Sequence, residues 1–174
     1  MSSDIRLTPT SYIVLGLIEA AGEATPYDLK GMVAVSLGNF WSIQHAQLYT
    51  EPERLAKAGY LRERREQGGR RRKHYKVTKR GREALRVWRE EPTDEMTELR
   101  DLGLLKIFFG GDPGAMARAQ LPAHESKLAE YEEIQRNAAE ELPPGPRLAL
   151  EAGIFHERAW LEFWSKFARD ETGD

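Results

Sequence analysis

The stretch of sequence that decides the fold spans residues 60–82 and reads YLRERREQGGRRRKHYKVTKRGR. Eleven of its residues are Lys or Arg and two are Glu, which gives the stretch a net charge of roughly +9. The Gly68-Gly69 pair separates two charged runs, and Tyr75 and Val77 alternate with charged residues in the second run. This pattern is typical of a β-hairpin, here with a strongly basic tip.

Helix signals precede the hairpin. Thr8-Pro9 and Thr25-Pro26 each place an N-cap residue before a proline in the first helical position. They predict a first helix through about Ala21 and a second helix that ends at Gly38-Asn39. The chain therefore begins with two short helices.

Two further helices flank the hairpin directly. Ser42 is expected to cap a third helix that runs to about Ala58 and stops at Gly59. Thr78 is expected to cap a fourth helix, whose apolar face covers the hairpin. The order helix, helix, helix, hairpin, helix predicts a winged helix-turn-helix over residues 1–91. The predicted fold class is mainly α with a small β-hairpin wing.

The winged unit is expected to bind duplex DNA, with the third helix in the major groove and the hairpin on the flanking phosphates. Gln44 and Gln47 are favoured for base contacts because their planar amides suit base edges. The predicted DNA-binding residues are Ser42, Gln44, His45, Gln47, Tyr49, Thr50, Arg65, Arg70, Arg71, Arg72, Lys73 and Lys76. The alternatives are a solvated helix face and, for the Arg70–Lys73 run, a solvated loop or a peptide signal.

Two segments carry a resemblance to a known family. Residues 48–61, LYTEPERLAKAGYL, resemble the leucine-tyrosine, arginine-leucine and glycine-hydrophobic pattern of the PadR family, named after the phenolic acid decarboxylase repressor. Residues 72–81, RKHYKVTKRG, are similar to that family's basic strand and the start of its fourth helix. Leu7–Thr10 and Gly16-Leu17 also fit its opening helix.

The resemblance implies a winged helix-turn-helix regulator whose virulence-activator-like C-terminal helices build a dimer. It implies that Tyr49 faces the DNA backbone. The sequence departs from the family at Thr50, where many members have proline, and at Pro52. Proline inside the third helix removes a backbone hydrogen bond to Leu48 and is expected to bend that helix, which leaves the direction of Arg54 open.

The remaining residues, 92–174, are predicted to form a helical dimerisation domain. A break at Glu91–Glu95 precedes an expected helix from Met96 to Phe109. A long helix should follow Pro113, with a bend at Pro122, and a last helix should follow the turn at Pro143–Pro146. The apolar stripe of the long helix comprises Leu121, Leu128, Tyr131, Ile134, Ala138 and Leu142.

Aromatic side chains cover more than one face of the last helix, which predicts a second packing surface supplied by a two-fold partner chain. The predicted dimerisation residues are Leu128, Tyr131, Ile134, Ile154, Phe155, Trp160, Phe163, Trp164 and Phe167. An alternative use of Trp88, Trp160 and Trp164 is a pocket for a flat aromatic effector, although stripes at helical spacing are more often core. A homodimer would read an inverted-repeat operator.

Several function classes lack their signatures in this sequence. There is no cysteine, no phosphate loop, no G-x-S-x-G elbow and no H-E-x-x-H pair. The adjacent pairs His124-Glu125 and His156-Glu157 point in different directions on a helix and cannot chelate one ion together. We therefore expect no enzyme activity and no metal or other cofactor. We also expect a cytoplasmic location without export signal or membrane span.

The formal net charge of −2 hides an asymmetry, since acidic residues outnumber basic ones by about two to one from Glu90 onward. The predicted function is promoter occupancy by a homodimeric repressor, with release by a small-molecule effector or another signal, and activation is left open. The rival classes are a winged-helix protein-interaction module, a non-specific architectural DNA binder and an RNA binder. The dense basic tip favours duplex DNA among them.

Overall fold

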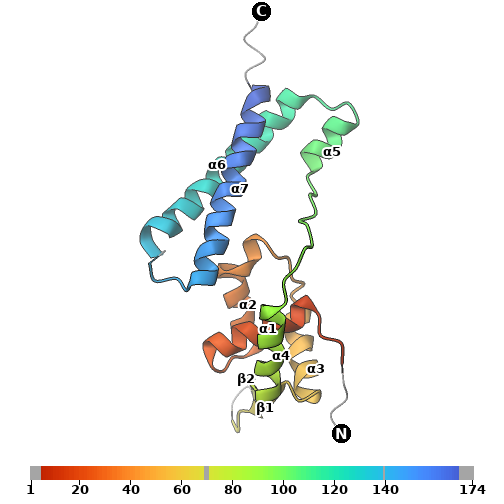
Figure 1. The fold of residues 1–174 in the computed structure, drawn as a ribbon, viewed down its shortest axis with the longest axis vertical. Coiled ribbons are helices and arrows are strands. Elements are labelled where there is room, and N and C mark those ends of the chain that lie inside the picture. Colours follow the sequence, from red (N-terminus) through yellow and green to blue (C-terminus); the bar gives the residue numbers. More distant parts are fainter. Residues whose placement is uncertain (1–4, 69–70, 139, 169–174) are drawn as a thin grey trace, which may run out of the picture. The chain divides into compact units, whose positions relative to one another are not determined.

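A computed structural model describes residues 5–68, 71–138 and 140–168 of the chain. The chain divides into two compact units, residues 1–95 and residues 96–174 (Figure 1). The division falls within residues 92–101, where the chain forms neither helix nor strand. Each unit has its own packed interior and is described by itself.

The first two helices are α1 (Pro9–Ala21) and α2 (Pro26–Val35), and both threonine caps are confirmed. Each cap is a reciprocal pair: Thr8 with Ser11, and Thr25 with Asp28. These pairs satisfy backbone N–H groups that a helix start leaves unbonded.

The predicted end of the second helix is wrong by about one turn. Helix α2 ends at Val35, and a short 3-10 turn, η1 (Leu37–Asn39), follows it. The amide of Ser36 donates to the carbonyl of Val33 at 3.3 Å, so the chain tightens before it reaches Gly38. Such tightening supplies partners for the last carbonyl groups of a helix.

The third helix, α3, spans Gln47–Lys57 and starts four residues later than predicted. Ser42 is therefore not its cap, and the N-cap position is Ala46, which makes no side-chain cap bond. Ile43 lies before the helix and packs against the core of the unit. The non-helical backbone there places this apolar side chain against the core, which competes with an earlier helix start.

The hairpin consists of β1 (Leu61–Arg65) and β2 (Lys73–Val77), paired antiparallel as the sequence predicts. Ala24, in the connection between α1 and α2, forms a further bridge to Tyr75 through hydrogen bonds of 3.1 and 2.9 Å. Tyr75 is fully buried, so this bridge fixes the base of the hairpin to the helices.

Helix α4 (Lys79–Glu90) closes this unit and begins at the predicted cap Thr78, whose hydroxyl accepts from the amide of Gly81 at 3.1 Å. A Cβ at Gly81 would collide with the carbonyl oxygen of Tyr60. Leu85 points into the core, while Trp88 stacks on Tyr12 at 4.6 Å between ring centroids. The core cluster comprises Val14, Leu15, Ile18, Ala24, Leu29, Val33, Leu48, Leu55, Ala58, Tyr60, Leu61, Tyr75, Val77 and Leu85.

The second unit begins with a shorter helix than the sequence predicts. Helix α5 spans only Leu102–Phe108, and its cap Asp101 accepts from the amide of Leu104 at 2.7 Å. Met96 and Leu99 lie in the non-helical segment before it and are exposed. Their helical spacing misled the prediction because this segment has no packed surface against which an apolar stripe could be buried.

The two long helices are α6 (Pro113–Ala138) and α7 (Pro144–Ala168), which pack along each other as a hairpin (Figure 1). Pro122 lies inside α6, which continues past it. Three of the predicted dimerisation residues, Tyr131, Ile154 and Trp164, are buried within one chain. They form the interior of this unit and have little surface left for direct contact with a partner.

The other six predicted dimerisation residues keep exposed surface. Phe155 is 77% exposed on α7. The partly buried members are Leu128, Ile134, Trp160, Phe163 and Phe167. Helix periodicity identified the apolar side chains. It did not predict which of them would be buried between α6 and α7 within one chain.

Candidate nucleic-acid interface

Helix α3 has one face in the core and one face in solvent. Leu48, Pro52 and Leu55 are buried at helical spacing. Gln47, Tyr49 and Thr50 are exposed, and Tyr49 retains 46% of its surface. The exposed face therefore presents an amide, a phenol and a hydroxyl, which can donate and accept hydrogen bonds at base edges and phosphates.

The other predicted residues of this region lie before the helix. Ser42, Gln44 and His45 are all exposed, in the irregular connection and the turn that lead into α3. The carbonyl of Gln44 accepts from the amide of Gln47 at 2.9 Å, which holds the turn against the helix start. The structure thus keeps these side chains beside the exposed end of α3, although they do not belong to the helix.

The strand register sorts the basic side chains of the wing onto two faces. Arg62 pairs across the strands with Lys76, and Arg64 pairs with His74. Because side chains alternate along a strand, these four residues share the face opposite to Tyr75. Arg62 and Lys76 are exposed, and neither makes an ion pair with another described residue.

Two predicted phosphate contacts, Arg65 and Lys73, are instead bound to carboxylates. Arg65 donates to Glu63 at 2.7 Å, and Lys73 binds Glu53 of α3 and lies 3.8 Å from Glu63. Burial tends to raise the pKa of Glu63, but hydrogen bonding to Arg65 is the larger effect and holds it below its usual value. The Glu63 carboxylate therefore stays charged and neutralises part of the wing.

The turn of the wing keeps some unpaired cations. Arg71 and Arg72 are exposed, and their side chains make no ion pair with another described residue. Arg71 has a φ of 47°, a left-handed conformation that is uncommon outside glycine and typical of tight turns. Arg70, also a predicted contact, lies outside the described residues.

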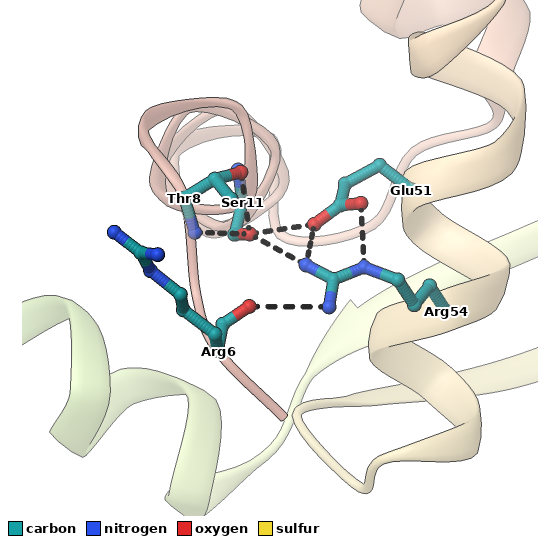
Figure 2. Close-up of polar contacts among 5 residues, drawn as sticks. All are labelled: Arg6, Thr8, Ser11, Glu51 and Arg54. Carbon is teal, nitrogen blue, oxygen red and sulfur yellow. Dashed lines mark hydrogen bonds and ion pairs between the residues drawn. The ribbon is translucent and has the colours of Figure 1, made fainter. Parts of the chain in front are cut away.

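Sequence reasoning did not include Arg62 among the candidate contacts because it did not derive the strand register, which places Arg62 opposite Lys76. It also left the direction of Arg54 open, and the structure shows that Arg54 binds Glu51 and Ser11 (Figure 2). Among the described residues, no group of three potential ligand side chains could hold a metal ion. In the same residues, no helix is long and apolar enough to cross a membrane.

An exposed polar helix beside a basic hairpin defines the class of winged helix-turn-helix DNA-binding proteins. Comparison with protein families assigns the two units separately: residues 14–87 match the Transcriptional regulator PadR-like family, and residues 99–169 match Virulence activator alpha C-term. This chain belongs to the PadR-like family of transcriptional regulators. The resemblance predicted from residues 48–61 and 72–81 is confirmed.

Individual relatives agree with this assignment. The negative transcriptional regulator PadR of Bacillus subtilis is 29% identical over 140 residues, which cover 73% of this chain and 75% of that protein. A crystal structure of Bacillus subtilis PadR in complex with operator DNA has a TM-score of 0.82 at 22% identity, covering 94% of this chain and 98% of that one. The same protein in complex with p-coumaric acid has a TM-score of 0.75 at 22% identity, covering 97% and 100%. These structures share the fold of this chain.

Proposed function

We propose that the chain is a homodimeric repressor that occupies an inverted-repeat operator, with no enzyme activity of its own. The observation that carries the proposal is the pairing of Arg62 and Lys76 on one face of the wing, beside a recognition helix whose exposed face is polar. Unpaired cations on that face can neutralise phosphates without first breaking an internal ion pair. Chromosomal DNA as the target makes the cytoplasm the expected location.

Side-chain chemistry indicates which residues of the interface suit the bases and which suit the DNA backbone. Gln47, on the first turn of α3, is the best candidate for a base contact, with Gln44 and His45 next to it. Tyr49 and Thr50 suit the DNA backbone. Ser42 is the sixth polar candidate and lies furthest from the helix along the chain.

Exposed apolar surface on the second unit supports the homodimer. Phe155 and Leu148 on α7 are 77% and 64% exposed, and Phe108 and Phe109 at the end of α5 are 81% and 79% exposed. Apolar side chains at this exposure commonly mark an interface with another chain. Two winged units joined in this way can read half-sites roughly 34 to 36 Å apart, or multiples of that distance.

Phe155→Glu tests the dimer surface. The variant should yield monomers by light scattering because a charge would be buried in an apolar interface. Val87→Glu is the matched control, since Val87 is 51% exposed on α4 of the other unit. A Phe155→Glu protein that remains dimeric would show that this part of α7 is not the interface.

An aromatic small-molecule effector is part of the proposal. It is supported by the crystal structure of Bacillus subtilis PadR in complex with p-coumaric acid. Trp88 of the first unit keeps 42% of its surface exposed, and Trp160 of the second unit is partly exposed, so each separately retains surface for contact with a flat ligand. Trp164 is fully buried within the chain, so it has no exposed surface for such a ligand.

Selection of bound sequences from a random duplex library tests the central claim. The purified protein should enrich an inverted repeat, and its affinity for that sequence should fall steeply with salt. Tight binding without sequence preference would identify an architectural DNA binder instead. Absence of binding at low salt would leave the protein-interaction module as the better interpretation.

A further inference from the structure

Helix α3 contains a proline at a position where a helix normally needs an amide hydrogen. Pro52 lies six residues into a helix of eleven, so it cannot donate to the carbonyl of Leu48. The exposed polar face, with Gln47 and Tyr49, lies before Pro52. The helix continues to Lys57 with one backbone hydrogen bond fewer at Pro52, so a side-chain contact across this position adds to its rigidity.

A bidentate ion pair spans the proline. The Nε atom of Arg54 donates to Oε2 of Glu51 at 2.8 Å, and its Nη2 atom donates to Oε1 at 2.7 Å. The Glu51 side chain is only 12% exposed, and that of Arg54 is 37% exposed. The two parallel bonds fix the geometry between residues on either side of Pro52 more firmly than a single contact would.

The same pair is attached to helix α1 (Figure 2). Oγ of Ser11, which is fully buried, donates to Glu51 at 2.6 Å and accepts from Nη2 of Arg54 at 3.0 Å. It also accepts from the amide of Thr8 at 2.8 Å as part of the helix cap. Nη1 of Arg54 donates to the carbonyl of Arg6 at 3.2 Å. The start of α1 and the middle of α3 therefore share one network.

This network leaves Arg54 little capacity to contact DNA. Four of the five N–H donors of its guanidinium are used by Glu51, Ser11 and Arg6. The neighbouring carboxylate would also repel a phosphate. Arg54 thus differs from Arg62, which is exposed and makes no ion pair with another described residue.

We propose that Glu51 and Arg54 are positioning residues that hold the recognition helix at a fixed orientation on α1, on both sides of Pro52, and so set sequence discrimination without touching DNA. The inference rests on the proposed DNA-binding function. Hydrogen bonds to base edges require a rigid helix, whereas long basic side chains on the wing reach phosphates over a range of orientations. Loosening the network should therefore lower discrimination and spare general affinity.

The test compares affinity for the selected sequence with affinity for random duplex DNA of equal length. Glu51→Gln and Arg54→Lys should lower the ratio of the two affinities about tenfold, the size of one lost base contact. Affinity for random DNA and its salt dependence should stay within twofold of the unaltered protein. The control is Glu83→Gln and Arg86→Lys, because Glu83 and Arg86 form the same bidentate pair on exposed α4.

Two further measurements separate positioning from general loss of stability. Amide hydrogen exchange in the free protein should accelerate in residues 48–57 and stay unchanged in α4. Adding Pro52→Ala to Arg54→Lys restores the missing backbone donor and should recover part of the discrimination. A variant that merely unfolds would lose affinity for all DNA.

The outcomes that overturn the inference are distinct. Equal losses on selected and random DNA, with unchanged hydrogen exchange in residues 48–57, would make Arg54 a phosphate contact. Full discrimination in both Glu51→Gln and Arg54→Lys, with unchanged exchange in residues 48–57, would remove the positioning role and leave the proposed function intact. Absence of sequence preference in the unaltered protein would overturn the proposed function and the discrimination role together.

Discussion

The face of the wing that carries Arg62 and Lys76 gives the sharpest prediction about DNA binding. Each protomer presents these two unpaired cations, so a dimer presents four. If each neutralises one phosphate, each contributes about 0.9 to the slope of log affinity against log salt concentration. Replacing both residues by alanine should therefore flatten the slope by about three to four units in the dimer.

Titration of a labelled operator duplex at four or more salt concentrations measures this slope. Arg136→Ala with Arg147→Ala is the matched control, because it removes two exposed positive charges from the second unit. The control should leave the slope nearly unchanged. An unchanged slope in the Arg62 and Lys76 double variant would refute the assignment of this face to phosphate contacts.

Lys73→Ala provides an internal comparison within the same wing. Lys73 already binds Glu53 and lies 3.8 Å from Glu63, so its charge is partly neutralised before DNA arrives. Its removal should change the slope by clearly less than the roughly 0.9 per protomer expected for Arg62→Ala. A change as large as that of Arg62→Ala would mean that the internal ion pair breaks on binding.

Further predictions concern specificity, packing and pH. Gln47→Ala should relax preference at one base pair, at a cost of about 1–3 kcal/mol on the selected sequence only; equal losses on random DNA would contradict base reading. Gly81→Ala should lower the free energy of unfolding, measured in urea, by about 1–3 kcal/mol or more, because its Cβ would meet Tyr60. Gly31→Ala should not destabilise the protein, because a Cβ at Gly31 has open space around it. Burial tends to raise the pKa of Glu51, but hydrogen bonds from Arg54 and Ser11 outweigh it and lower that pKa. The resulting stability is present above the ordinary glutamate pKa and is lost as pH falls through the lowered value. The difference in unfolding free energy between the unaltered protein and Glu51→Gln should therefore shrink in acid, and a difference independent of pH would contradict this.

Local sequence signals predict an element well where the contacts that stabilise it lie between neighbours in the sequence. Thr8, Thr25 and Thr78 cap helices because their hydroxyls satisfy nearby backbone amides, which needs no tertiary contact. The helix start at Ser42 was wrong because a cap residue competes with distant packing, here that of Ile43 against the core. Met96 and Leu99 show the same limit, since helical spacing without a surface to cover does not make a helix.

The sequence by itself determined the class of fold and the family of this protein. Residues 60–82 concentrate positive charge in a hairpin, and residues 48–61 carry the family pattern; both are contiguous and can be read directly. Only the tertiary structure decided which charged side chains are paired within the chain and which remain exposed. Strand register brings Arg62 beside Lys76, and helix packing brings Arg54 to Ser11, 43 residues away. Ion pairs and burial depend on which distant side chains meet, so identical arginines become a candidate phosphate contact in one place and a support for the recognition helix in another.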